Sequence, residues 1–136
     1  MTKQSKIFVF ILIMSIIISI AIISIILANK NNINSDDTFV KQHLLYLDEG
    51  ASDIVFLDVT LYFSKDDAFL EINYDYSYLG IERQTRYLVN RYTGQIVNGG
   101  YEDNYPEFMN NFNAVKANYT QKKVYSMADI NRLLDK

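Results

Sequence analysis

An uninterrupted apolar run near the N-terminus constrains this chain more than any other feature. From Ile7 to Ala28 no side chain is charged, and the only polar side chains are the hydroxyls of three serines. A helix over these 22 residues extends roughly 33 Å, enough to cross a hydrocarbon layer of about 30 Å. A buried helix of a soluble protein is rarely apolar on every face at this length. We therefore expect residues 7–28 to be a transmembrane helix.

A cleaved secretory signal has a similar layout, but its apolar region spans only about 7–15 residues and ends in small residues. Here the large, β-branched Ile26 stands two positions before Ala28, where a small residue would be needed. The chain has no cysteine, which excludes lipid attachment of the lipoprotein type. These features indicate a signal anchor that is not cleaved.

The lysines that flank the run predict its orientation. Lys3 and Lys6 precede it, and Lys30 alone follows closely. The more basic flank of a membrane helix stays on the cytoplasmic side. We expect a single-pass protein of the cell membrane in which residues 1–6 are cytoplasmic, 29–37 form a linker, and 38–136 form an extracytoplasmic domain.

Charge and cysteine content narrow the function of that domain. Ten basic and 16 acidic side chains remain once Lys3, Lys6 and Lys30 are set aside, a net charge of −6. Nucleic acid requires a basic footprint, so we expect no nucleic-acid partner, and an acidic surface favours a basic protein partner. One histidine and no cysteine argue against a transition-metal site and against thiolate catalysis. We expect no cofactor.

Hydrophobic periodicity predicts the elements of the domain. Apolar residues recur at helical spacing from Phe39 to Leu47, with N-cap candidates at Ser35–Asp37 and a stop at Gly50. Alternating apolar and polar residues then indicate strands. The expected strands lie in Asp53–Ser64, Ala68–Tyr78, Arg83–Arg91 and Gln95–Asn98.

The C-terminal third is expected to be mainly helical. Pro106 suits the first turn of a helix that carries an apolar stripe from Phe108 to Tyr119. Ser126 and Asp129 have the spacing of a capping box, which begins a last short helix. Strands that are grouped rather than alternating with helices predict an α+β fold, a three- to four-stranded antiparallel sheet packed against helices on one face.

One resemblance follows from this element order. The helix, the strand hairpin and a third strand that ends in Thr93-Gly94, with Ile96 after it, resemble a PepSY-type extracytoplasmic module over residues 38–98. The resemblance implies an exported, often membrane-tethered, non-catalytic domain connected with protease inhibition or envelope assembly. The charged residue of that family before the turn is matched only loosely, by Asn90 or Arg91.

We expect no catalytic residues and no metal site. His43, the only histidine, lies beside the apolar stripe of its helix, and no nucleophile motif accompanies it. Glu71, Asn73 and Asp75 share one face of a strand, where neighbours stand almost 7 Å apart, so a solvated sheet face is favoured over a cation site.

Tyrosine is the unusual component of the domain. Tyr74, Tyr76 and Tyr78 continue the inward row of their strand, while Tyr62 points outward, and Tyr101 and Tyr105 follow in a loop. Such a row is either the wet rim of a sheet or a binding face, because tyrosine offers rigid amphipathic contact area. We take Tyr74, Tyr76, Tyr78, Tyr101 and Tyr105 as the candidate partner-binding site.

The sequence therefore favours a membrane-anchored, non-enzymatic protein that binds a protein partner outside the membrane. Two roles fit, an inhibitor or immunity factor, or a subunit of an envelope or secretion machine. One alternative is a hydrolase that uses carboxylates such as Glu71 and Asp75. Another is a structural membrane subunit that acts through its transmembrane helix.

Overall fold

The computed structural model describes the backbone of residues 2–51 and 53–136, and the side chains of all of these except 28–34. The chain divides into two compact units, with the boundary between Phe39 and Val40.

The first unit consists of helix. Helix α1 runs from Lys3 to Gly50, and its part Lys3–Leu27 has a mean hydropathy of 3.2, long and apolar enough to cross a membrane. The hydroxyls of Ser15, Ser19 and Ser24 donate to backbone carbonyls three or four residues earlier, at 2.8–2.9 Å. A polar group in lipid must be satisfied internally in this way. The side chain of Ala28, the expected end of the span, lies outside the described residues.

The expected linker is helical. Helix α1 continues through residues 29–37, so Ser35–Asp37 do not begin a new helix. Between Ala28 and Gly50 there is no glycine or proline. Adding residues to an existing helix gains one hydrogen bond for each residue, whereas a second helix would need its own unfavourable nucleus. The side chains of 29–34 lie outside the described residues.

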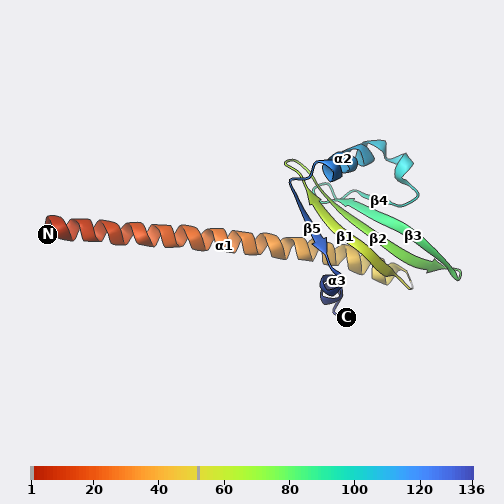
Figure 1. Ribbon diagram of the computed structural model, residues 1–136, viewed down its shortest axis with the longest axis horizontal. Helices are drawn as coiled ribbons and strands as arrows, with labels where there is room; N and C mark the ends of the chain where they lie inside the picture. The colour runs from red at the N-terminus through yellow and green to blue at the C-terminus, as the bar shows by residue number, and fades with distance from the viewer. Residues whose placement is uncertain (1, 52) are drawn as a thin grey trace. The chain divides into compact units, whose positions relative to one another are not determined.

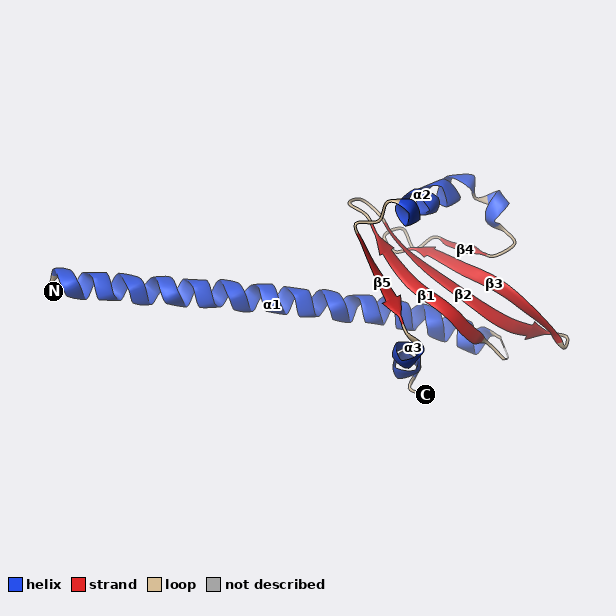
Figure 2. Ribbon diagram, viewed as in Figure 1, coloured by secondary structure: helices blue, strands red, loops and turns tan. Residues whose placement is uncertain are grey.

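The second unit, Val40–Lys136, contains an antiparallel sheet. Its strands have the order β4-β3-β2-β1-β5 (Figure 2). They are β1 Val55–Phe63, β2 Ala68–Tyr78, β3 Ile81–Asn90, β4 Ile96–Asn98 and β5 Gln121–Tyr125. The predicted α+β class is confirmed. The sheet has five strands rather than three or four, because Gln121–Tyr125 pairs along β1 as an edge strand.

Helices cover both faces of the sheet, where we had expected one covered face. Helix α2, Pro106–Ala117, covers one face, and Phe69 of β2 stacks there against Phe108 and Phe112 at 5.3 and 5.7 Å. The last turns of α1 and the helix α3, Met127–Leu134, lie on the opposite side (Figure 1). We call the side that bears Phe69 the α2 face and the side that bears Ile72 and Tyr87 the α1 face.

The second helical layer buries two side chains that we expected to face solvent. Tyr62 and Glu71 alternate with the α1-face residues of β1 and β2, so both lie under α2. Tyr62 is buried and the Glu71 side chain is only 2% exposed.

A β-bulge alters the start of β1. The register of β1 against β2 shifts between Phe56 and Asp58. Phe56 is therefore the buried residue, whereas Val55 and Leu57, which strict alternation with Val59 and Leu61 would place inward, are exposed. A bulge adds one residue to one strand and reverses the alternation on one side of it.

Several local predictions are confirmed. Gly94 has φ = 72° in the turn between β3 and β4, a conformation that glycine adopts readily. Pro106 stands in the first turn of α2, and Ser126 and Asp129 form a reciprocal capping box on α3. Helix α1 ends at Gly50.

Candidate functional site

The tyrosines of β2 become progressively exposed toward the end of the strand. Ile72 is fully buried on the α1 face, Tyr74 and Tyr76 are half-buried, and Tyr78 is 58% exposed. Helix α1 ends at Gly50, and beyond it β2 and β3 continue as a hairpin (Figure 2). The sheet therefore projects past its helical cover on this face.

The rings of this row contact one another. Tyr74 lies 6.1 Å from Tyr76 and 6.5 Å from Phe56 between ring centroids. Burial raises the pKa of the Tyr74 hydroxyl above its usual value of 10.0. Among the described residues no hydrogen-bond partner is found for the hydroxyls of Tyr74, Tyr76 and Tyr78. These polar tips are left to solvent or to a binding partner.

Three residues that sequence reasoning missed extend the row. Tyr46, near the end of α1, lines a hollow of about 280 Å³ together with Tyr74. Ile81 of β3 stands directly opposite Tyr78 and is 57% exposed. Together with Leu79, described next, Tyr46, Tyr74, Tyr76, Tyr78 and Ile81 form the set that we call the tyrosine face.

The third missed residue is Leu79, at the tip of the β2–β3 hairpin. Leu79 and Gly80 both have positive φ, 53° and 76°, as the central residues of a type I′ turn do. Asparagine and glycine are preferred there, because other residues are strained at positive φ. Leu79 is also 85% exposed. The only sequence signal was the dipeptide Leu-Gly between two strands.

The other two predicted site residues lie elsewhere. Tyr105 lines a hollow of about 490 Å³ with Phe69 and Phe108, on the α2 face. Tyr101 precedes the short 3-10 helix η1, Glu102–Asn104, whose Glu102 contacts Arg86 on the same side. The described ring contacts do not join either residue to the tyrosines of β2. The five tyrosines therefore do not form one surface.

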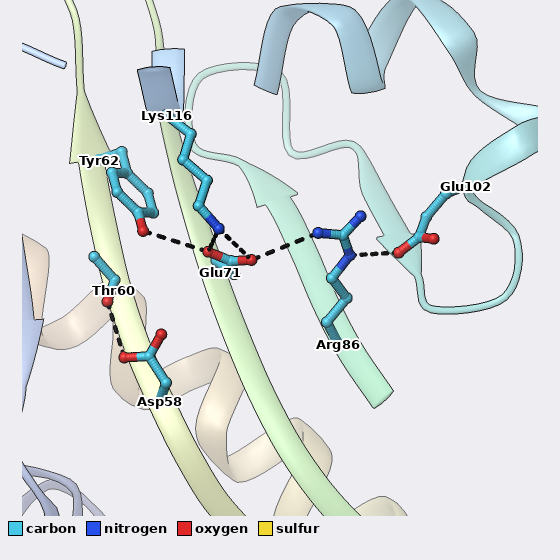
Figure 3. A network of polar contacts seen from close by, with 7 residues as sticks. All are labelled: Asp58, Thr60, Tyr62, Glu71, Arg86, Glu102 and Lys116. Atoms are coloured by element: carbon cyan, nitrogen blue, oxygen red, sulfur yellow. Dashed lines mark hydrogen bonds and ion pairs between the residues drawn. The ribbon is translucent and has the colours of Figure 1, made fainter. Parts of the chain in front are cut away.

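An ionic network centred on the buried Glu71 lies under α2 (Figure 3). The Glu71 carboxylate accepts from Lys116 Nζ at 2.9 and 3.1 Å and lies 3.7 Å from Arg86 Nη1. The Tyr62 hydroxyl donates to it at 3.4 Å, and Arg86 also donates to Glu102. Burial and then the negative charge of Glu71 raise the pKa of Tyr62 to about 12. Because Lys116 belongs to α2 and Glu71 to β2, their ion pair binds α2 to the sheet.

This network does not resemble the pair of carboxylates used by hydrolases. Glu71 and Asp75 lie four residues apart on β2, which places them about 13 Å apart along the strand. Paired catalytic carboxyls of glycosidases are separated by about 5–9.5 Å. Among the described residues no group of three or more histidine, aspartate or glutamate side chains is placed to hold a metal ion.

His43 is a half-buried residue of the α1 face. Its Nδ1 lies 2.8 Å from the hydroxyl of Tyr87, a fully buried residue. Burial lowers the pKa of His43 below 6.5. The histidine therefore joins α1 to the sheet as a neutral side chain near pH 7.

No protein-family model matches the sequence, and neither a curated protein nor a solved structure is found to be similar to it. The resemblance to PepSY-type modules stays a prediction.

Proposed function

We propose that this protein is a single-pass, non-enzymatic protein of the cell membrane whose second unit, outside the cytoplasm, binds a protein partner through the tyrosine face. The apolar helix Lys3–Leu27 supports the anchor, and the lysines at positions 3 and 6 support a cytoplasmic N-terminus.

The observation that carries the binding proposal is the exposed apolar end of the β2–β3 hairpin. Tyr78, Leu79 and Ile81 lie within four consecutive residues, and each is more than half exposed. A contiguous exposed apolar patch on a soluble domain commonly marks an interaction site. Valine or isoleucine at positions 74 and 76 would favour a strand equally without a hydroxyl to hydrate. A surface that is covered only when a partner binds accounts for these residues.

Two roles are consistent with such a surface, an inhibitor or immunity factor, and a subunit of an envelope or secretion machine. The acidic balance of the chain beyond its anchor favours a basic partner and salt-sensitive association. The geometry of Glu71 and Asp75 gives no support to the carboxylate hydrolase.

Site-specific photocrosslinking in the producing cells tests the proposal. A photoreactive amino acid replaces Tyr78 in one variant and Tyr92 in a matched control. Tyr92 is also exposed, at 63%, but follows the opposite end of β3. We expect a discrete adduct from position 78 and none from position 92. Equal adducts from both positions, or none from position 78, would contradict the assignment of the surface.

A further inference from the structure

The outer edge of β3 is partly without a neighbouring strand. Strand β4 pairs only with Tyr87–Val89, and Gly99 adds one hydrogen bond from its N–H to the carbonyl of Arg86 at 2.7 Å. A side chain at position 99 would collide with Thr85, so only glycine permits this close approach. Within the part of the chain that the structure describes, no strand covers the outer edge of residues 81–85.

The hydrogen-bonding direction of this edge follows from its neighbours. Asn90 N–H and Arg86 C=O both point toward β4, since they bond Gln95 and Gly99. Backbone groups of alternate residues in a strand point to the same side. The N–H and C=O groups of Gln84 and Glu82 therefore point outward, and no described residue supplies them with a partner.

This edge carries the charged residues Glu82 and Arg83, but it lacks lysine, proline and a bulge, three common protections against strand addition. The opposite edge strand, β5, carries Lys122 and Lys123, and lysine on an edge discourages pairing. The free stretch of β3 has no lysine or proline, and its register against β2 is unbroken from Ile81 to Asn90. No bulge therefore interrupts the stretch, and its outward backbone groups are open to hydrogen bonding.

The two sides of the edge differ in chemistry. On the α1 face it adjoins Tyr76 and Tyr78, which pair with Arg83 and Ile81, and the hollow beside Tyr74. On the α2 face a hollow of about 370 Å³ is lined by Asn73, Gln84, Thr85, Arg86, Gly99, Gly100 and Glu102. Arg86 and Glu102 form an ion pair, so their charges cancel. The negative charge of this side therefore comes from Asp75 and Glu82.

We propose, resting on the partner-binding function above, that the partner supplies an extended segment that adds to the sheet as a strand along residues 81–85 of β3. Its backbone bonds Glu82 and Gln84. Its apolar side chains contact the tyrosine face, and its alternate, basic side chains point toward Asp75 and Glu82. Main-chain hydrogen bonds with alternating side-chain contacts are the recognised mode of β-strand addition.

A second copy of this chain fits the edge poorly. Antiparallel pairing of two copies along residues 81–85 must centre on Arg83, which places the two arginines directly opposite each other. Like charges opposite each other in a sheet are destabilising. The occupant is therefore a segment of a different protein, with alternating basic and apolar residues.

The first test uses a blocked nine-residue peptide that alternates lysine and valine, added to the full-length protein in nanodiscs. Hydrogen exchange should slow at the amides of Glu82 and Gln84. Gln84→Pro removes the outward N–H and is tolerated on an edge strand, and it should weaken binding about tenfold. Gln84→Ala keeps the N–H and should change binding less than about twofold.

Thermal unfolding of both variants establishes that they fold. A peptide of the same composition with its lysines and valines in separate blocks should bind more weakly. Equal binding of Gln84→Pro and Gln84→Ala, or protection elsewhere than at Glu82 and Gln84, would overturn the strand-addition proposal.

The second test separates this proposal from the function on which it rests. The crosslink from position 78 is measured in the Gln84→Pro and Gln84→Ala backgrounds. We expect loss of the adduct only with proline. An adduct that is equally strong in both backgrounds would leave partner binding intact and refute strand addition. Absence of the adduct even without a substitution at position 84 would count against the function itself.

Discussion

Glu71 is the residue through which an ion pair joins α2 to the sheet. Its carboxylate is buried, and Lys116 compensates its charge from α2 at 2.9 Å. The lysine ammonium also lies 5.6 Å from the Phe112 ring centroid, at the distance of a cation–π contact. Removing a partner from a buried charge leaves that charge poorly compensated, which is far more destabilising than loss of a surface ion pair.

We therefore expect Lys116→Met to lower the free energy of unfolding by about 1–3 kcal/mol, with Arg86 retaining part of the compensation. The matched control is Lys41→Met, because Lys41 pairs with Asp135, which is 83% exposed. That change should cost less than about 1 kcal/mol. Urea denaturation of both variants measures the difference, and equal effects would show that the network does not stabilise the domain.

His43 should make stability dependent on pH. Its pKa is lowered by burial in the folded chain, so the unfolded chain takes up a proton first as the pH falls. The contribution is fully present above the unfolded value of 6.5 and is lost as the pH falls below it. His43→Gln, whose amide can replace the imidazole as a partner of the Tyr87 hydroxyl, should flatten the dependence of the unfolding free energy on pH below the unfolded pKa of 6.5. An unchanged slope would exclude His43 as its source.

At the scale of elements, the apolar tip of the β2–β3 hairpin lowers the stability of its turn. Leu79 at φ = 53° occupies a position where asparagine is favoured. Leu79→Asn should raise the free energy of unfolding by about 0.5–1 kcal/mol while weakening the crosslink from position 78. Thermal denaturation and crosslink yield measure the two effects. A variant that is more stable and crosslinks as well as the unmodified chain would show that Leu79 is not part of the surface.

The order and type of most elements could be predicted, because period-two and helical patterns report directly on which residues are buried. Gly50, Gly94 and the Ser126–Asp129 capping box are local signals, and each acts where it was expected. Of the tyrosine face, the sequence indicated only the residues on a single strand, which are Tyr74, Tyr76 and Tyr78. Their shared face follows from alternation alone.

What the sequence did not reveal depends on contacts between distant segments. An apolar stripe on α2 does not specify which sheet face it covers, so Glu71 and Tyr62 were expected in solvent. The compensation of Glu71 comes from Lys116, 45 residues away. Tyr101 and Tyr105 were grouped with the β2 tyrosines by proximity in sequence, but the chain crosses to the α2 face before Tyr105.

At the scale of the whole molecule, the proposed orientation places Val40–Lys136 outside the cell. Protease added to intact cells should then degrade this unit, whereas a cytoplasmic protein of the same cells stays protected. The expectation follows from Lys3 and Lys6 before the apolar helix and Lys30 after it. Full protection of the unit until the membrane is permeabilised would show that the unit is cytoplasmic, the opposite of the proposed orientation.

The most direct test asks whether the outer unit or the membrane span recognises the partner. Residues 7–28 are replaced by an unrelated single span of the same orientation, and the crosslink from position 78 is measured in the chimaera. Recognition by the tyrosine face predicts the same adduct at a similar yield. Loss of the adduct in a chimaera that still reaches the membrane and folds would contradict the account, and would assign binding to the transmembrane helix.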